Sequence, residues 1–284
     1  MVRVIALCLV FFYLAVGVLL NTPLYDFCVL APSKKIDTTR FDSLHGAKKR
    51  KFSIPAFGSQ IQAWLFSVEG AKHLAIVHHG RGGNLYNKVF LAQHLINLGM
   101  SVLVYDYRGY GESTGVARLK NFVPDGLLVH DFATNELGYN PSKIIIVGES
   151  IGTGPACEIA RQRSCAAIFL QSPFTSLTQE AKDCFPILHI YPDWCFPNPK
   201  FENIEYVRKV HPPLLIIHGA IDKQIPASHF RKLGEVATDP KQLILLPHAG
   251  HRNVGGEDAT IYTEGLTIFF SKYLKEKSES QGTR

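Results

Sequence analysis

From residue 52 onward, short apolar runs alternate with longer segments that show helical spacing. Residues 52–57 and 60–67 flank Gly58 and Ser59, a pattern typical of two antiparallel strands joined by a tight turn. The later runs are nearly continuous in Val, Ile and Leu, as expected of strands covered on both faces. These runs are residues 73–78, 100–105, 143–147, 166–170, 213–218 and 241–246.

Segments with apolar residues three and four positions apart separate these runs and predict helices. In residues 85–98, Leu85, Val89 and Ala92 fall on one face, and Gly99 follows as a stop signal. The other predicted helices are residues 122–137, 152–163, 227–236 and 256–275. Repeated strand–helix units after a strand pair predict one α/β domain over residues 52–275, with a mostly parallel, doubly wound sheet.

Residues 171–212 break this rhythm, because they separate two predicted strands without a strong helical pattern. The segment is rich in aromatic residues and has five prolines before His211. Loops of this length are uncommon unless they are functional, so we expect a small lid. The alternative is an insertion that packs on the edge of the sheet. The polar tail, residues 276–284, is expected to be disordered.

The N-terminal residues 4–20 contain neither a charge nor a proline. A helix of this length spans about 26 Å, close to a hydrocarbon core of about 30 Å, so residues 1–21 are expected to form a single-pass membrane anchor. The alternative is a cleaved signal peptide, which would make the protein secreted or lumenal. Lys34, Lys35 and Arg40 follow the span and favour a cytoplasmic body, although the side of the membrane stays open.

The charge of the chain is concentrated near this segment. The 284 residues carry a formal charge of +6, and residues 1–51 have eight basic against three acidic residues, leaving +1 for the rest. Residues 22–51 therefore form a basic connector, and the nearly neutral domain argues against nucleic acid as a partner. The run at residues 48–51 (KKRK) has two interpretations: a solvated strand face, which we favour, or contact with anionic lipid.

Composition excludes several other protein classes. With 46% hydrophobic and 19% charged residues the chain is not disordered, and six cysteines are too few for a disulfide scaffold. Cys184 and Cys195 bracket the lid and are candidates for a bridge in an oxidising compartment, although free thiols are the default. The histidines lack metal-ligand spacing, so neither a metal nor a cofactor is expected.

The sequence Gly148-Glu149-Ser150-Ile151-Gly152 (GESIG) follows one predicted strand directly and precedes a helix. Gly-x-Ser-x-Gly between a strand and a helix is typical of a sharp turn that raises a nucleophilic serine above the sheet. The small residues on both sides allow the backbones to approach. We therefore predict Ser150 as the nucleophile, with the Ile151 N–H at a helix N-terminus.

A serine nucleophile requires a base, and the base requires a carboxylate that orients it. His251 in HAGH (residues 248–251) follows the last strand and is the preferred base, with His248 as the alternative. Asp222 follows the strand at residues 213–218 and is the preferred carboxylate. Asp258 is a poorer candidate, because an acid near a helix start often only stabilises that start. The order Ser150, Asp222, His251 is the order of an α/β hydrolase.

The glycine-rich segment after the strand at residues 73–78 is the candidate oxyanion-binding loop. Its Arg81 N–H is predicted to act with that of Ile151. The Arg81 side chain either binds an acidic group of the substrate or points to solvent. The segment DYRGYGES (residues 106–113) is expected to be structural, with a tight turn and an internal Asp–Arg pair.

Together these motifs resemble the α/β-hydrolase superfamily over about residues 50–274. The resemblance rests on HHGRGGN (residues 78–84), DYRGYGES, GESIG, HGAIDKQIP (residues 218–226) and HAGH. The chain looks most similar to membrane-anchored α/β-hydrolase domain proteins of the bud-emergence type, and more distantly to depalmitoylating hydrolases. This resemblance implies a serine hydrolase with the triad Ser150, Asp222 and His251. Arg81 is a departure, because related loops often carry Asn there.

Three functions are compatible with the sequence. The preferred one is hydrolysis of an ester or thioester of a small-molecule or lipid acyl group near a membrane. The second is an aminopeptidase-like amide hydrolase, which needs a lid carboxylate such as Glu180, Asp183 or Asp193 to hold an amine. The third is a non-catalytic, membrane-anchored binding module. Fold alone does not select among them.

Overall fold

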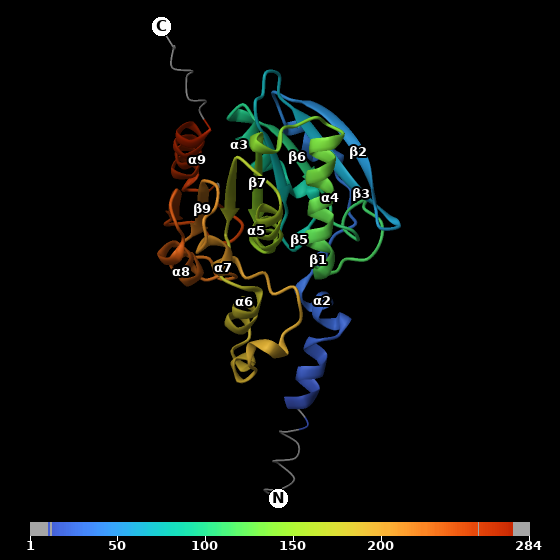
Figure 1. The fold of residues 1–284 in the computed structure, drawn as a ribbon, viewed down its shortest axis with the longest axis vertical. Coiled ribbons are helices and arrows are strands. Elements are labelled where there is room, and N and C mark those ends of the chain that lie inside the picture. The colour runs from blue at the N-terminus through green and yellow to red at the C-terminus, as the bar shows by residue number, and fades with distance from the viewer. Residues whose placement is uncertain (1–10, 12, 255, 275–284) are drawn as a thin grey trace, which may run out of the picture.

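The computed structural model describes residue 11 and residues 13–254 and 256–274. Its centre is an eight-stranded sheet with the strand order β10-β9-β8-β7-β4-β6-β3-β2 (Figure 1). Among the described strands of this sheet, β3 alone runs opposite to the others: it pairs antiparallel with β2 and β6, and the remaining pairs are parallel. The strands are β2 (Lys48–Ala56), β3 (Ser59–Ser67), β4 (Leu74–His78), β6 (Ser101–Tyr105), β7 (Ile144–Glu149), β8 (Ala167–Gln171), β9 (Leu214–Gly219) and β10 (Lys241–Leu246).

Helices cover both faces of the sheet, so the predicted α/β architecture with a mostly parallel sheet is confirmed. Buried residues of α3 and α9 pack on one face, and those of α4, α5 and α8 pack on the other. These helices are α3 (Val89–Asn97), α4 (Phe122–Asn135), α5 (Thr153–Gln162), α8 (Ala227–Val236) and α9 (Ala259–Tyr273).

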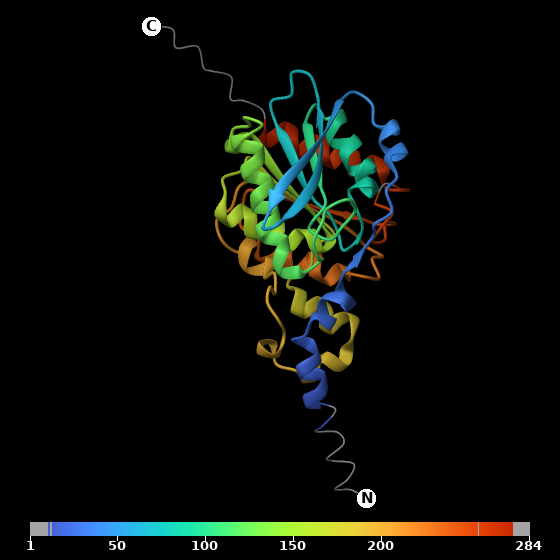
Figure 2. The same cartoon turned by 90° about the vertical axis from the view of Figure 1, so that its right-hand side faces the viewer.

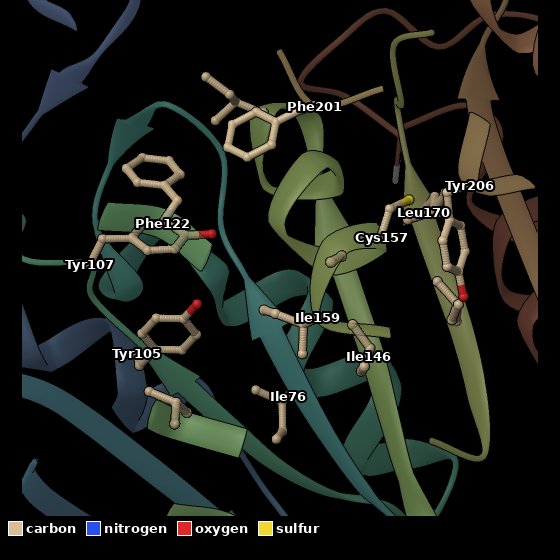
Figure 3. Packing of buried hydrophobic residues seen from close by; sticks show 14 of the residues in the cluster. Ile76, Tyr105, Tyr107, Phe122, Ile146, Cys157, Ile159, Leu170, Phe201 and Tyr206 are labelled. Carbon is tan, nitrogen blue, oxygen red and sulfur yellow. The ribbon is translucent and has the colours of Figure 1, made fainter. Parts of the chain in front are cut away.

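The sheet has one hydrophobic core on each face, and the alternation of side chains along each strand explains both. In β7, Ile144 and Ile146 face the α4–α5 side, and Ile145 and Val147 face the α3–α9 side. Successive side chains of a strand point to opposite faces, so a strand covered on both faces needs apolar residues at every position. Figure 3 shows the core on the α4–α5 side, where residues of β4, β7 and β8 lie beside those of α4 and α5.

Sequence reasoning located the elements but missed details at their ends. The predicted turn at Gly58-Ser59 lies one residue earlier, because Phe57 and Gly58 adopt positive φ and Ser59 already pairs with Ala56. Strand β2 begins at Lys48, four residues before the predicted start. The four residues 48–51 are exposed strand residues, which agrees with the solvated-face interpretation.

The segment between β8 and β9 is built from short helices. It contains α6 (Leu177–Cys184), the 3₁₀ turns η6 (Pro186–Ile190) and η7 (Asp193–Cys195), and α7 (Asn203–Val207). Helix α7 packs against α5 and α8, whereas α6, η6 and η7 project away from the sheet and its helices (Figure 1). We call residues 177–196 the lid. Cys184 and Cys195 are both free thiols.

The N-terminal part of the chain lies against the lid. Residues 13–20 are helical and are followed by α2 (Pro23–Val29). Tyr13 stacks on Tyr191 with ring centroids 4.5 Å apart, and the Tyr191 hydroxyl donates to the Tyr13 carbonyl. Figure 2 shows the N-terminal helical segments and the lid side by side at one end of the molecule.

The predicted membrane anchor and tail fall largely or wholly outside the described residues. Residues 4–10 and 12 of the apolar run lie outside them, as does the tail at residues 276–284. In the part of the chain that the structure describes, no helix combines the length and apolar character needed to cross a bilayer. The anchor therefore stays a prediction.

Candidate functional site

Ser150 occupies a strained turn between β7 and α5. Its backbone has φ of +54°, a left-handed conformation that a non-glycine residue adopts only when the surrounding structure enforces it. Both flanking glycines are required by space: a Cβ on Gly152 would lie 2.0 Å from the His78 carbonyl oxygen, and one on Gly148 would lie 2.7 Å from the Thr153 Cα. This packing holds the Ser150 side chain at the carboxyl edge of the sheet.

His251 and Asp222 meet Ser150 at this edge. The His251 Nε2 lies 3.0 Å from the Ser150 Oγ, and the His251 Nδ1 lies 2.7 Å from the Asp222 Oδ2. The Asp222 Oδ1 accepts hydrogen bonds from the N–H groups of Gln224 and Ile225 at 2.8 and 2.9 Å. Burial alone would raise the Asp222 pKa, but the interactions with His251 and these two N–H groups hold it below its usual value. An ionised Asp222 can keep the Nδ1 of His251 protonated, which leaves Nε2 as an acceptor toward Ser150.

The two alternative residues pair with each other instead. The His248 Nδ1 lies 3.0 Å from the Asp258 Oδ1, and the His248 N–H donates to the other oxygen of the same carboxylate. The His248 side chain is exposed, whereas Asp258 is buried. This pair holds the loop that carries His251 against the start of α9. Among the described residues, the side-chain hydrogen bonds of His248 and Asp258 join them to each other and do not include Ser150.

The predicted oxyanion-binding loop lies directly against Ser150. A Cβ on Gly80 would lie 3.4 Å from the Ser150 Cβ. Among the described residues, no backbone or side-chain acceptor takes the Arg81 N–H. Ile151 is the second residue of the 3₁₀ turn η5 (Ser150–Gly152), where an N–H has no partner within the helix. Both N–H groups predicted to bind an oxyanion therefore belong to segments that touch the Ser150 turn.

The connector that follows α2 holds this loop, which the sequence did not reveal. Strand β1 (Ala31–Pro32) pairs in parallel with β5 (Gly82–Gly83). The Ala31 N–H donates to the Arg81 carbonyl at 3.1 Å, and the Ser33 N–H donates to the Gly83 carbonyl at 3.0 Å. Two-residue strands carry no periodic signal, so a sequence pattern could not have identified this pairing.

Comparisons with known proteins agree with this architecture. A family model described as "alpha/beta hydrolase fold" matches residues 76–196. The human alpha/beta hydrolase domain-containing protein 17B is 33% identical over 212 residues, which cover 72% of this chain and 68% of that protein. The chain belongs to the α/β-hydrolase family.

This α/β hydrolase is also similar to a lipase in sequence and to an esterase in structure. The lysophosphatidylserine lipase ABHD12 of Macaca fascicularis is 36% identical over 197 residues, covering 62% of this chain and 48% of the lipase. An esterase of Pyrococcus furiosus superposes with a TM-score of 0.70 at 15% identity, covering 87% of this chain and 99% of the esterase. At that identity the second likeness is one of fold.

The segment DYRGYGES of this hydrolase makes structural contacts near the site. Arg108 does not pair with Asp106, as expected from the sequence, but with Asp125 of α4 at 2.6 Å. Asp106 instead accepts from the Leu85 N–H at 2.7 Å. Burial raises the pKa of Asp106 to about 7. The expected internal Asp–Arg pair is therefore wrong, because α4 brings a buried carboxylate to Arg108 from outside the segment.

Two cavities of different character meet at Ser150. The first, of about 340 Å³, is enclosed mainly by apolar side chains of the N-terminal helical segments, the lid and the body. The second, of about 720 Å³, lies toward the loops of the sheet edge and is lined by polar residues such as Gln171, Asn253 and His251. Arg81 and Ser150 line both cavities. A group bound across Ser150 therefore has an apolar side and a polar side.

The wall of the apolar cavity contains residues that sequence reasoning did not assign to the site. Besides the lid, the N-terminal segments line it with a set of mostly apolar side chains: Val16, Leu19, Leu20, Leu24, Tyr25, Cys28 and Val29. The sequence predicts an anchor for residues 1–21 from hydrophobicity and a connector for residues 22–51 from charge, and neither signal indicates a cavity wall. The lid contributes one carboxylate, Glu180, whose pKa is raised by burial.

Proposed function

We propose that this α/β hydrolase cleaves a carboxylic ester or thioester of an apolar acyl group, with Ser150 as nucleophile. The observation that carries the proposal is the continuous chain from the Ser150 Oγ through His251 to Asp222, at the junction of an apolar and a polar cavity. A histidine within hydrogen-bond distance of a strained serine, oriented by a buried carboxylate, is the arrangement that activates a hydroxyl group.

In this mechanism the Ser150 Oγ attacks the carbonyl carbon while His251 Nε2 takes its proton. The carbonyl oxygen becomes an oxyanion, which the N–H groups of Arg81 and Ile151 stabilise. The C–O or C–S bond then breaks, and His251 returns the proton to the leaving alcohol or thiol. Water, deprotonated by His251, attacks the carbonyl carbon of the acyl-Ser150 ester. The bond between that carbon and the Ser150 Oγ breaks, His251 returns the proton to Oγ, and the carboxylic acid is released. Asp222 stays ionised and balances the charge on His251 throughout.

The two cavities orient the substrate. The apolar cavity accommodates the acyl chain, because burial of apolar surface stabilises binding by about 25 cal/mol per Å². The polar cavity accommodates the leaving group, whose hydrogen-bonding groups need partners. The name of the macaque relative, a lysophosphatidylserine lipase, supports a lipid ester with one acyl chain.

The nucleophile is tested with a fluorophosphonate probe, which forms a covalent bond with an activated serine. We expect the wild-type protein to be labelled and Ser150→Ala to be unlabelled. Ser172→Ala is the matched control: Ser172 is a buried serine with a positive φ at the end of the neighbouring strand, and its variant should be labelled like the wild type. Equal labelling of the wild type and Ser150→Ala, or labelling of neither, would refute the assignment.

The lid weakens the case for an aminopeptidase-like activity. Asp183 lies 3.0 Å from the His229 Nε2, and Asp193 pairs with Lys182 at 2.5 Å. The third candidate, Glu180, does line the apolar cavity, but burial raises its pKa and thereby disfavours the anion that would hold an ammonium group. Turnover of acyl esters, acyl thioesters and aminoacyl anilides separates the two activities, and we expect the anilides to be the poorest substrates. A non-catalytic module would hydrolyse none of them.

The connector pairing makes a separate prediction. Ala31→Pro removes the N–H that donates to the Arg81 carbonyl and should displace the oxyanion-binding loop, lowering kcat/KM for ester hydrolysis by about 10- to 100-fold. Ala31→Ser keeps that N–H and should retain the wild-type value. Steady-state kinetics and thermal unfolding are measured on both variants. Unchanged kcat/KM in a folded Ala31→Pro protein would show that the pairing does not position the loop.

A further inference from the structure

Large apolar side chains are exposed together at the end of the molecule formed by the lid and the N-terminal segments. Trp194 and Phe27 are each 79% exposed. The other members of this group are Phe11, Leu14, Val18, Leu19, Leu24, Phe185, Ile187 and Ile190. We call these ten side chains the apolar end. Isolated exposed apolar residues are ordinary, but a group gathered on one projection marks an interaction surface.

The segments that carry the apolar end pack against each other. Leu20 packs in a small core with Leu188, Tyr191 and Phe196 of the lid. The Asn21 side chain also donates to the Cys195 carbonyl at 2.8 Å. The helix at residues 13–20 and the lid thus use one set of apolar side chains to hold each other and leave the other set on the outside. Figures 1 and 2 show that these segments project together from the body.

Charges at this end are few and mostly compensated. Lys182 pairs with Asp193, and Asp26 of α2 lies 3.5 Å from Arg118. Residues 13–20 contain no charged side chain. Contact with an apolar phase therefore requires little desolvation of unpaired charge, which is the main cost of such contact.

The apolar cavity reaches the surface at the same end. Leu24, Phe185 and Ile187 line the cavity and also belong to the exposed group. The cavity wall therefore continues into the apolar end, and the same cavity is lined by Ser150. A chain entering from this side passes along apolar side chains before it reaches the serine.

We propose that the apolar end inserts into a lipid bilayer at the boundary between headgroups and acyl chains, so that the apolar cavity takes its substrate chain directly from the membrane. The inference rests on the proposed function, to which it adds the source of the substrate. The sequence that precedes the apolar end favours a bilayer as its partner. Phe11 belongs to the apolar end, and residues 1–10 before it are apolar except for one charged side chain, Arg3. An exposed Trp with neighbouring Phe, Ile and Leu is typical of a surface that lies in the membrane interface.

Tryptophan fluorescence tests the insertion, because the chain has two tryptophans in different places. Trp194 is in the apolar end, whereas Trp64 is partly buried in β3. The full chain is reconstituted in phosphatidylcholine vesicles with brominated acyl chains, which quench only nearby indoles. A surface segment buried about 5–10 Å deep should lose about half of the Trp194 emission relative to unbrominated vesicles. Trp194→Phe should show no such loss.

A relocated tryptophan provides the matched control. In Trp194→Phe/Val210→Trp, the new indole lies just before β9, near the amino ends of the parallel strands. The site lies at their carboxyl ends, so this indole should not be quenched. Unquenched Trp194 in vesicle-bound wild-type protein would overturn the proposal. A dimer in detergent together with unquenched Trp194 would do the same and would assign the apolar end to a second copy of the chain.

Activity provides the second test, with variants outside the cavity and the triad. Ile190→Ser/Trp194→Ser should lower turnover of a long-chain ester presented in vesicles by about tenfold, equivalent to about 1.4 kcal/mol of lost contact with the bilayer. Its turnover of a short, water-soluble ester should be unchanged. Val210→Ser/Ile268→Ser, which removes two exposed apolar side chains elsewhere, should change neither value. An equal loss on both substrates would contradict membrane loading.

The two proposals fail in different ways. Ser150→Ala should retain full bromolipid quenching, because insertion does not depend on the nucleophile. Absence of fluorophosphonate labelling with intact quenching would refute the hydrolase mechanism and leave the membrane surface in place. Normal labelling without quenching would refute the membrane surface alone.

Discussion

His251→Ala is expected to lower kcat for ester hydrolysis by about 10⁴- to 10⁶-fold, the range for loss of the base of a serine triad. Without the imidazole 3.0 Å from its Oγ, Ser150 has no group to take its proton. Activity that remains would come from substrate binding and the oxyanion-binding N–H groups. The measurement is steady-state hydrolysis of a chromogenic ester, with circular dichroism to establish folding.

His248→Ala is the matched control for this loss. His248 lies three residues earlier on the same loop, but its ring contacts Asp258 and not Ser150. We expect kcat to stay within about threefold of the wild type, because the His248 backbone N–H still donates to Asp258. A larger loss in His248→Ala than in His251→Ala would mean that the base has been assigned to the wrong histidine.

Asp222→Asn is expected to lower kcat by about 10⁴-fold while the protein stays folded. The amide occupies the same space, and its oxygen can still accept from Gln224 and Ile225. If that oxygen faces those two N–H groups, the amide NH₂ faces His251 Nδ1 and favours the tautomer whose proton is on Nε2. The imidazole then presents a proton to Ser150 instead of accepting one.

Asp258→Asn separates this electronic effect from loop packing. Asp258 holds the same loop through His248 but lies outside the chain to Ser150. Its variant should lose some thermal stability and little kcat. Comparable losses of kcat in the two Asn variants would indicate that both aspartates act by holding the loop, and would count against Asp222 as the partner of the base.

Much of the candidate site was predictable because its signals are local. GESIG requires small residues beside Ser150 for steric reasons, and the structure shows the close contacts of Gly148 and Gly152 that impose them. Asp222 and His251 were selected because they follow parallel strands, and the carboxyl ends of such strands meet at one edge. The sequence preferred His251 over His248 as the base, and the structure places the His251 ring, and not that of His248, beside Ser150, 101 residues away in the chain.

The sequence by itself determined the order of the main strands and helices. A strand covered on both faces is apolar throughout, and a helix covered on one face is apolar every three to four residues. It also determined the Ser, Asp and His candidates, because their chemistry depends on residue type and position after a strand. Only the tertiary structure decided what encloses them. The hydrogen bond from the Ala31 N–H to the Arg81 carbonyl joins segments far apart in the chain, as does the cavity wall that residues 16–29 form beside Ser150. Such contacts depend on the packing of one apolar surface against another, and hydrophobicity along a chain does not specify its partner.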